Sequence, residues 1–507
     1  MSVRFPISSH PILTAAAAKT FEAEYFGGDA DAEWRAMQRA GNAVGESIWR
    51  DFGEFGAWPS QAAILVLAGK GHNAGDALIA AQRLLRELPR ATVEVAFVFP
   101  SGELRPLVQK AYRELVQFAA GRVSSVRIGD VVEKHYSAWI DGVFGYQFHP
   151  PLDARLKGQF ETIARTRVDF RAAVDLPSGL GDPAALRADV SYATGILKAE
   201  LTEPAHREAA GRIRYLDLGF FDEEKTATPN KLRVLAPSML RELGCLRSAT
   251  SDKRTYGHLL VVGGSRRFPG AIMMSVRAAL RTGVGLLTAV VPESLVPAYA
   301  AHVPEAMWVG CPETPNGGLA LEGIGLIREV SGRATALAMG PGLAREAETL
   351  ALIRDILQEV DRPVVLDADA LQVDIVSRGR QQKIVTPHAG EFKRLAGETS
   401  LSDYVRETGL ICVEKGAPTR IAQADTTYIS AMGGPVLARG GSGDMLAGMI
   451  GGLLAQDPGY PLEAACCGVL WHGMAADCWA RRRGAVAVQS TELLDFLAVA
   501  LREGDAS

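Results

Sequence analysis

The hydrophobic pattern repeats one unit along the chain: a short apolar run, a glycine-rich turn, and a segment with helical spacing. The apolar runs at 63–67, 259–262 and 336–339 lead into glycines at 69–71, 263–264 and 340–342. Such runs, bounded by glycine and followed by helical periodicity, are typical of strand–turn–helix units and parallel sheets. We therefore predict an α/β fold whose ligands bind at the carboxyl ends of the strands, where these glycines fall.

The pattern is interrupted once, which predicts two domains. An apolar strand at 215–218 is followed by a polar, turn-rich segment, and the next strand–turn–helix cycle begins at Gly257. We place the first domain at 1–222, a linker at 223–240 and the second domain at 241–507. Each domain is long enough to enclose a core of its own. For the first we expect a Rossmann-like, three-layer α/β/α arrangement.

Composition and charge narrow the class of protein. The 507 residues are 48% hydrophobic and 22% charged, and 54 Lys+Arg against 58 Asp+Glu give a net charge of −4. This balance disfavours a nucleic-acid partner. There is no uncharged apolar run of about 18 residues, as a membrane helix requires, and the first residues make a poor signal peptide. The six cysteines lack metal-type spacing, so we interpret them as reduced thiols in a soluble, cytoplasmic enzyme.

The first glycine-rich turn carries candidate binding residues. Residues 69–77 follow a predicted strand and open a helix expected over 77–88, and glycines there let the backbone approach a phosphate. Gly69-x-Gly71-x-x-Ala74 is a weak dinucleotide-binding fingerprint. An acidic residue about 20 positions on should end the next strand, but that strand ends in Phe99-Pro100.

Two later strands of the first half also end in polar residues. One ends in Asp141-Gly142, and the other in Asp175-Leu176-Pro177-Ser178-Gly179. Each aspartate taken alone could simply cap a turn. Polar residues at three strand ends, however, favour convergence on one cleft.

Together with Met37–Gly41, these three segments resemble the NAD(P)H-hydrate epimerase domain. The resemblance implies a potassium ion held by Asn73, Asp141 and Ser178, all of which offer oxygen ligands. It also implies that Asp175 acts beside the reacting ring. The substrate-binding residues that it implies are His72, Asn73, Asp76, Gly145 and Asp175.

The chain departs from this family's pattern, G-x-G-N-N-G-G-D-G, at three positions of the first loop. His72, Ala74 and Ala77 replace Asn, Gly and Gly, and Tyr146–His149 replaces the family's T-G-L and basic residue. An alanine in place of a glycine with positive φ is strained by roughly 1 kcal/mol or more. If Ala74 or Ala77 replaces such a glycine, the loop is strained and the epimerase activity would be weakened, altered or lost.

The second half contains a stronger motif at 435–448. Gly440, Gly441 and Gly443 precede or open an apolar helix that is expected to run through Leu454, and their amides form a ready anion site. Asp444, in the first turn, could accept or position a substrate hydroxyl proton. It could also simply complement the helix dipole. The surrounding glycines favour a phosphoryl-transfer cleft.

This turn resembles that of the ribokinase-like superfamily, and the rest of the second half resembles the NAD(P)H-hydrate dehydratase domain. The matching segments are 256–265, 269–271, 278–286, 340–343, 365–371, 386–392, 413–419 and 470–473; Arg254 and Arg439 depart from the pattern. The resemblance implies that Ala271, Gly342, His388 and Asp444 contact the hydrated nucleotide. It implies that Lys415, Gly416, Ala417, Pro418, Thr419 and Gly443 hold ADP or ATP with Mg²⁺.

Three further residues have no single chemical role in the sequence analysis. Asp367 and Asp369 could organise Mg²⁺ or hydrogen bond at a strand end, and His472 is assigned to helix packing.

The two resemblances imply one repair reaction on the small molecules NADHX and NADPHX, the hydrated forms of the reduced nicotinamide cofactors. Phosphorylating the ring hydroxyl makes it a good leaving group, and the first domain interconverts the epimers. A homo-oligomer is expected. The alternative is a kinase for a small alcohol, with a non-catalytic binding module as its first half.

Overall fold

The computed structural model describes residues 5–221 and 230–504, which form two compact units. The first unit contains residues 10–221, Asn230 and 480–485. The second contains 5–9, 231–479 and 486–504. Of the linker expected at 223–240, residues 223–229 lie outside the described part of the chain. The remainder belongs to the second unit and includes strand β9 (Leu232–Leu235).

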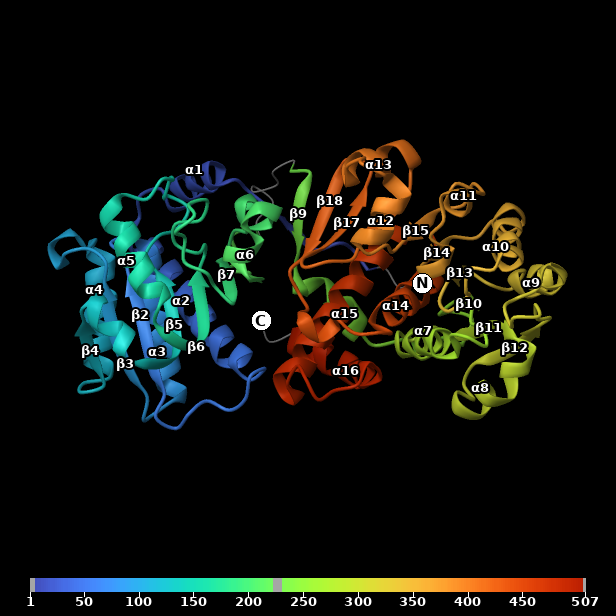
Figure 1. Cartoon of the computed structure of the whole chain (residues 1–507), viewed down its shortest axis with the longest axis horizontal. Coiled ribbons are helices and arrows are strands. Elements are labelled where there is room, and N and C mark those ends of the chain that lie inside the picture. The colour runs from blue at the N-terminus through green and yellow to red at the C-terminus, as the bar shows by residue number, and fades with distance from the viewer. Residues whose placement is uncertain (1–4, 222–229, 505–507) are drawn as a thin grey trace. The chain divides into compact units, whose positions relative to one another are not determined.

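The first unit has a sheet of seven strands, all parallel, in the order β4-β3-β2-β5-β6-β7-β8 (Figure 1). The predicted strand at 63–67 is β2, whereas β8 ends at Leu216, two residues before the expected end. The strands are β2 (Ala63–Ala68), β3 (Thr92–Phe97), β4 (Val123–Val126), β5 (His135–Gly142), β6 (Arg167–Val174), β7 (Val190–Thr194) and β8 (Arg212–Leu216).

Alternation along β2 shows why this unit has three layers. Ile64 and Val66 face one core, and Leu65 and Leu67 face another, so both faces of the sheet are covered. Side chains from α2 (Ala30–Phe52), α3 (His72–Glu87) and α4 (Pro106–Phe118) fill the first core, and α5 (Ala154–Ala164) contributes to the second. The predicted α/β/α arrangement is confirmed. The remaining helices are α1 (Ala15–Phe26) and α6 (Arg207–Ala210).

Helix α3 begins at His72, five residues before the predicted start. Ala74 and Ala77 are therefore buried helical residues, and neither has a positive φ. The nearby glycines are required for close approach instead: a Cβ at Gly69 would collide with the Val143 carbonyl, and one at Gly75 with the Met37 sulfur. The expectation that the two alanines strain the loop is wrong.

The second unit has an eleven-stranded sheet in the order β1-β9-β18-β17-β16-β15-β14-β13-β10-β11-β12 (Figure 1). The block from β16 to β12 is parallel, and β17 and β18 form an antiparallel hairpin beside it. Its strands are β1 (Ser9–Pro11), β9, β10 (His258–Val262), β11 (Leu286–Pro292), β12 (Met307–Cys311), β13 (Ala336–Met339), β14 (Val364–Leu366), β15 (Lys383–Val385), β16 (Ile411–Glu414), β17 (Thr419–Gln423) and β18 (Thr426–Ser430).

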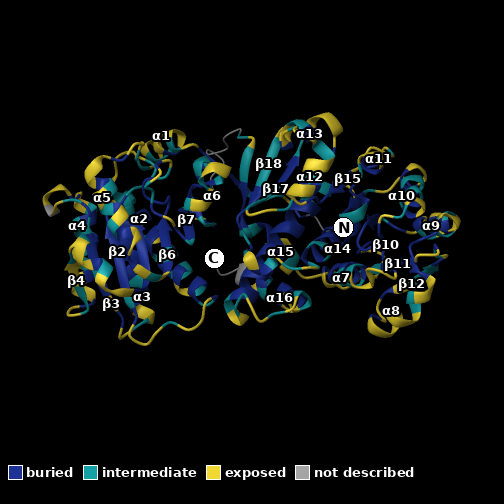
Figure 2. Cartoon of the chain, in the orientation of Figure 1, coloured by how far each residue is buried: buried dark blue, intermediate teal, exposed yellow. Residues whose placement is uncertain are grey.

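Helix α14 (Ser442–Gln456) is buried along nearly its whole length, which explains its apolar sequence (Figure 2). It packs against α7 (Pro269–Arg281), β10 and β13. The other helices are α8 (Val296–His302), α9 (Ile324–Ser331), α10 (Ala347–Glu359), α11 (Val373–Val376), α12 (Ala389–Ala396), α13 (Leu401–Thr408), α15 (Pro461–Arg483) and α16 (Leu493–Gly504). Within the described ranges, every helix is too short or too polar to span a bilayer.

Candidate functional sites

In the first unit, the polar residues predicted at three strand ends lie on neighbouring strands. Strands β2, β5 and β6 are adjacent in the sheet. Asn73 lies in the first turn of α3 after β2, Asp141 is the penultimate residue of β5, and Ser178 follows β6. Parallel strands end at the same edge, so their side chains gather there.

Asp141 and Ser178 are hydrogen bonded to each other. The Ser178 hydroxyl donates to Asp141 Oδ1 over 2.6 Å, and its backbone amide donates to Oδ2 over 2.8 Å. Val143 N donates to Oδ1 over 3.1 Å. Burial raises the pKa of Asp141 to about 6, although these hydrogen bonds oppose the shift. The pair ties the end of β5 to the turn after β6.

Asn73 joins the same cluster. Its side-chain amide donates to the Val174 carbonyl over 2.8 Å and to the Phe144 carbonyl over 3.3 Å. The Ser178 hydroxyl is 3.4 Å from that Phe144 carbonyl oxygen. Two carbonyl oxygens therefore accept from the Asn73 amide, and one of them, that of Phe144, also adjoins the Ser178 hydroxyl. A Cβ at Gly145 would crowd this amide, so the glycine is needed for the close approach.

Asp175 follows β6 and forms an ion pair that the sequence did not reveal. Its Oδ1 is 2.5 Å from the ammonium of Lys198, and both side chains are almost wholly buried. Burial raises the pKa of Asp175, and the Lys198 charge opposes that shift. Asp175 has a φ of 65°, in the left-handed region that non-glycine residues seldom adopt. The feature of the sequence that could have indicated this buried pair is the position of Lys198 directly after the apolar Ile196-Leu197.

Asp76 and His72, one turn apart on α3, line a hollow beside α1 and α2. Glu22, Glu33 and Thr194 line it as well. Burial raises the pKa of Asp76 well above its ordinary value, and the charges of Asp175 and Glu22 add to the shift. Burial lowers the pKa of His72. All five predicted substrate residues thus lie on α3 or at the ends of β5 and β6.

The departure from the family pattern after Gly145 brings in an aromatic residue. The Tyr146 hydroxyl donates to Glu22 Oε2 over 2.6 Å, and the Lys198 ammonium lies 5.4 Å from the centre of the Tyr146 ring. Tyr146, one of the residues that differ from the pattern, therefore takes part in this cluster.

In the second unit, the predicted residues follow five strands that are consecutive neighbours in the sheet, β10-β13-β14-β15-β16. Ala271 lies in α7 after β10, and Gly342 follows β13. Asp367 follows β14, His388 follows β15, and Lys415 follows β16. The fold thus places these residues along one edge, as the strand ends predict.

The glycine turn forms the start of α14. Gly441 is the N-cap with a φ of 90°, and a Cβ there would collide with the Met274 sulfur. Gly443 and Asp444 lie in the first turn, where amide groups lack helical partners. Burial raises the pKa of Asp444 to about 6; the charge of Asp367 adds to the shift, and that of Lys415 opposes it. Ser275 anchors this turn by donating to the Asp444 carbonyl over 2.6 Å.

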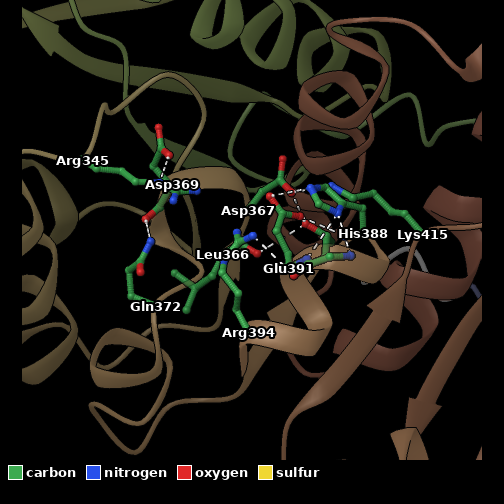
Figure 3. Close-up of polar contacts among 11 residues, drawn as sticks. Arg345, Leu366, Asp367, Asp369, Gln372, His388, Glu391, Arg394 and Lys415 are labelled. Carbon is green, nitrogen blue, oxygen red and sulfur yellow. Dashed lines mark hydrogen bonds and ion pairs between the residues drawn. The ribbon is translucent and has the colours of Figure 1, made fainter. Parts of the chain in front are cut away.

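Lys415 lies close to Asp367 (Figure 3) and also to the glycine turn. Its ammonium is 2.8 Å from Asp367 Oδ1, which also accepts a 2.7 Å hydrogen bond from the Thr386 hydroxyl. A Cβ added to Gly443 would lie 3.2 Å from the Lys415 nitrogen, so the ammonium faces the start of α14. Burial lowers the pKa of Lys415, but Asp367, Glu391 and Asp444 outweigh it and the net shift is upward.

His388 forms the N-cap of α12. Its Nδ1 accepts from the amides of Gly390 and Glu391 over 3.0 and 3.3 Å, and Glu391 accepts from the His388 backbone amide over 2.9 Å (Figure 3). An accepting Nδ1 places the ring proton on Nε2. The side chain is more than half exposed. Sequence reasoning missed this capping role, and the Nε2 atom lies 3.4 Å from Glu391 Oε1.

The remaining predicted residues lie near these groups. Gly342 has a φ of 70°, and a Cβ there would be 3.2 Å from that of Ala271, so the two positions adjoin. Gly416, Ala417 and Pro418 connect β16 to β17, and Thr419 begins β17. Asp369 binds Arg345 over 2.9 Å (Figure 3). Asp367 and Asp369 are thus committed to ion pairs and hydrogen bonds.

The two basic departures lie outside the strand-end cluster. Arg439 donates to the carbonyls of Val486 and Val488 over 2.9 and 3.2 Å. Arg254 is exposed in a turn where its amide donates to Asp252 over 2.8 Å. His472 is buried in α15, and burial lowers its pKa to about 4.

Two family models match this chain. Residues 34–200 match the family described as YjeF-related protein N-terminus, and residues 259–498 match NAD(P)H-hydrate dehydratase. Within the described residues there is no group of three or more His, Cys, Asp or Glu side chains arranged to hold a metal ion.

Curated relatives match over nearly the whole chain. A bifunctional NAD(P)H-hydrate repair enzyme of Gloeobacter violaceus is 33% identical, covering 96% of this chain and 98% of the relative. One from Moorella thermoacetica is 32% identical, covering 92% of each. Among solved structures, an ADP/ATP-dependent NAD(P)H-hydrate dehydratase from Bacillus subtilis, co-crystallised with ATP and Mg²⁺, is 29% identical with a TM-score of 0.46. It covers 53% of this chain and 97% of that chain.

Proposed function

The chain belongs to the family of bifunctional NAD(P)H-hydrate repair enzymes, and from that premise we propose that it restores hydrated NADH and NADPH. The second unit dehydrates one epimer of the hydrate at the expense of ADP or ATP, and the first unit interconverts the epimers. The observation that carries the proposal is the position of Lys415 and Asp444 at the glycine turn of α14. Residues 1–222 are assigned to the epimerase domain and 241–507 to the dehydratase domain.

The dehydratase reaction requires activation of a ring hydroxyl and stabilisation of a transferring phosphate. Asp444, when ionised, accepts the hydroxyl proton as the oxygen attacks the terminal phosphate. The amides at the start of α14 and the Lys415 ammonium stabilise the charge on the phosphate. Loss of phosphate instead of hydroxide then lets the ring regain its conjugation.

Substrate contacts of this site are assigned to Ala271, Gly342 and His388. Gly342 and Ala271 adjoin, so one ligand could contact both. The nucleotide contacts are assigned to Lys415–Thr419 and Gly443. Mg²⁺ would be carried in by the nucleotide phosphates, because Asp367 and Asp369 are engaged with Lys415 and Arg345.

In the first unit, the epimerase site is formed by Asp175, Asp76, His72 and Gly145. Potassium fits the cluster of Asn73, Asp141 and Ser178, because these side chains and the nearby carbonyls offer only oxygen once the Asn73 amide is reversed. The Asn73 nitrogen lies within hydrogen-bond distance of the Phe144 and Val174 carbonyls. The ion would hold the loop before Gly145 against the end of β6.

The protein is further proposed to act in the cytoplasm as a homo-oligomer. A reducing compartment agrees with six cysteines that are all free thiols in the structure.

The decisive experiment is incubation of the full chain with hydrated NADH and either ADP or ATP, following the return of reduced-cofactor absorbance. We expect recovery only when nucleotide is present, and Asp444→Asn serves as the inactive control. Accumulation of a stable phosphorylated product, without recovery of absorbance, would instead identify a small-alcohol kinase.

A further inference from the structure

Lys198 is buried in the first unit with Asp175 as its ion-pair partner. Its side chain is 1% exposed, that of Asp175 is 3% exposed, and the nitrogen–oxygen distance is 2.5 Å. The free energy needed to remove both charges from water is about as large as the free energy that their attraction returns. Such a buried pair therefore adds little to the stability of the fold. A buried lysine at a predicted substrate residue therefore requires a functional explanation.

The backbone conformation of Asp175 also indicates a functional site. Its φ of 65° is unfavourable for a residue with a side chain, and strain of this kind concentrates at functional sites. The Asp175 amide donates to the Tyr192 carbonyl over 2.9 Å, and the Thr194 backbone hydrogen bonds to its carboxylate. Strand β7 therefore fixes both the conformation of Asp175 and the direction of its side chain.

A second buried carboxyl group lies near this pair but has no partner. Asp76 is 7% exposed, and no described residue makes a hydrogen bond or ion pair with its carboxyl oxygens. It lines the hollow that Glu22, His72 and Thr194 also line. Thr194 thus contacts the Asp175 carboxylate and adjoins the hollow that Asp76 faces.

The ionisable groups around these two aspartates come from several elements, and Glu33 of α2 and His72 of α3 also line the hollow that Asp76 lines. Glu22 is on α1, Asp76 on α3, Tyr146 in the loop after β5, Asp175 after β6, and Lys198 after β7. Of the carboxyl groups of Glu22, Glu33, Asp76 and Asp175, only that of Asp175 is bonded to the Lys198 ammonium. Charge balance leaves Asp175 ionised and leaves the unpartnered Asp76 to retain its proton.

We propose that Asp76 and Asp175 are the acid and the base of the epimerase, and that Lys198 is the positioning residue that keeps Asp175 ionised. The inference rests on the proposed epimerase activity of this unit. It assigns a role to Lys198, which neither the motifs nor the predicted substrate contacts include.

The chemistry of the hydrate fits one acid and one base. Water adds to the dihydropyridine ring at the carbon beside the ring nitrogen, so that carbon bears both a hydroxyl group and nitrogen. Asp175 removes the hydroxyl proton as the carbon–nitrogen bond breaks, and Asp76 gives its proton to the nitrogen, leaving an open-chain aldehyde. Rotation about the adjacent carbon–carbon bond presents the other face of the carbonyl. The nitrogen then re-adds, returning its proton to Asp76, while Asp175 returns its proton to the oxygen.

The test uses the full chain and one purified epimer of hydrated NADH, without nucleotide, with the two epimers separated by chromatography over a range of pH. For Lys198→Met we expect kcat to fall about 100-fold at pH 7 with KM changed less than about threefold. Loss of the ammonium raises the pKa of Asp175, so its ionised fraction at a given pH falls. The acidic limb of the rate profile should therefore move to higher pH by at least one unit.

Lys198→Arg keeps the charge and should restore most of the rate and the original limb. Asp76→Asn keeps the shape but has no proton to donate, so the alkaline limb should disappear and kcat should fall about 100-fold or more. The matched control is another buried ion pair of this unit, Arg214 with Asp51 at 3.4 Å. Arg214→Met should lower the melting temperature without moving the pH profile.

A Lys198→Met protein that epimerises with the wild-type rate and pH profile would overturn the inference while leaving the epimerase in place. If Lys198→Met fails to fold, the Asp76→Asn variant tests the inference instead. An alkaline limb of its pH–rate profile that is unchanged from the wild type would also overturn the inference. A wild-type chain that fails to epimerise at any pH would overturn the proposed function itself, and the acid–base assignment with it.

Discussion

The ammonium of Lys415 is held 2.8 Å from Asp367 Oδ1 and faces Gly443 at the start of α14. The buried Asp367 carboxylate thus holds the Lys415 ammonium toward the start of α14, where backbone amides without helical partners can bind an anion. Asp367 and Lys415 follow strands β14 and β16, which are separated by a single strand in the sheet. The sheet order therefore brings together two charges that lie 48 residues apart in sequence.

Replacing Lys415 should weaken nucleotide binding more than it slows catalysis of the bound complex. A hydrogen bond to a charged group contributes about 1.5–3 kcal/mol, or about 10- to 100-fold in affinity. We expect Lys415→Met to raise the Kd for ADP and ATP by that factor in titration calorimetry. Lys415→Arg should lose less, because it keeps the charge. Unchanged affinity in both variants would contradict the position assigned to the ammonium.

Asp444→Asn should abolish dehydration without preventing nucleotide binding. The group acts as a base only when ionised, and its pKa is raised to about 6. In the wild type, kcat/KM should therefore fall about tenfold per pH unit below pH 6, a limb that reports the free enzyme.

Asp367→Asn removes the neighbouring charge that helps to raise this pKa, so the limb should move to lower pH. Measurement of kcat/KM from pH 4.5 to 8 checks both statements. An acidic limb that stays in place in Asp367→Asn would show that the limb belongs to another group.

The two glycines before α14 provide a matched pair for testing the turn. Gly441 has a φ of 90° and contacts Met274, whereas a Cβ at Gly440 meets nothing within 4 Å. Gly441→Ala should lower stability by about 1–2 kcal/mol or more and weaken nucleotide binding. Gly440→Ala should leave the melting temperature nearly unchanged. Equal effects of the two substitutions on the melting temperature would argue against the left-handed cap.

Restoring the family's glycines in α3 should destabilise the first unit. Ala74 and Ala77 are buried and helical, so a glycine at either position loses about 1 kcal/mol of helix propensity and leaves a small void. We expect Ala74→Gly and Ala77→Gly to lower the unfolding temperature of this unit in calorimetry. A rise in that temperature would support the strained loop that the sequence suggested.

The candidate site residues could be proposed because turn residues and glycines at strand ends are readable in local sequence and because their motifs resemble those of a known family. Residues 336–339 are β13 as predicted, and Asp141 and Ser178 do lie at neighbouring strand ends. Lys198 was missed because one lysine after an apolar run carries no local mark of burial. The capping role of His388 was missed because histidine is not among the residues that ordinarily cap helices.

The prediction from local sequence also placed the start of α3 five residues too late, and it assigned residues 231–240 to a linker instead of to the second unit. The start of α3 depends on whether residues 72–76 can pack against α2, which Gly75, close to Met37 of α2, allows. Strand β9 is assigned by its pairing with β18, almost 200 residues later in the chain. No window of nearby residues contains that pairing.

The sequence by itself determined the alternation of strands, glycine turns and helices, because periodicity and backbone preference are properties of neighbouring residues. It also determined the family, because the motifs recur in order along the chain. Only the tertiary structure decided which strands adjoin, that Lys198 pairs with Asp175, and that Lys415 is directed by Asp367. Those relationships depend on pairing and burial between distant segments, and burial sets the charge state of each group.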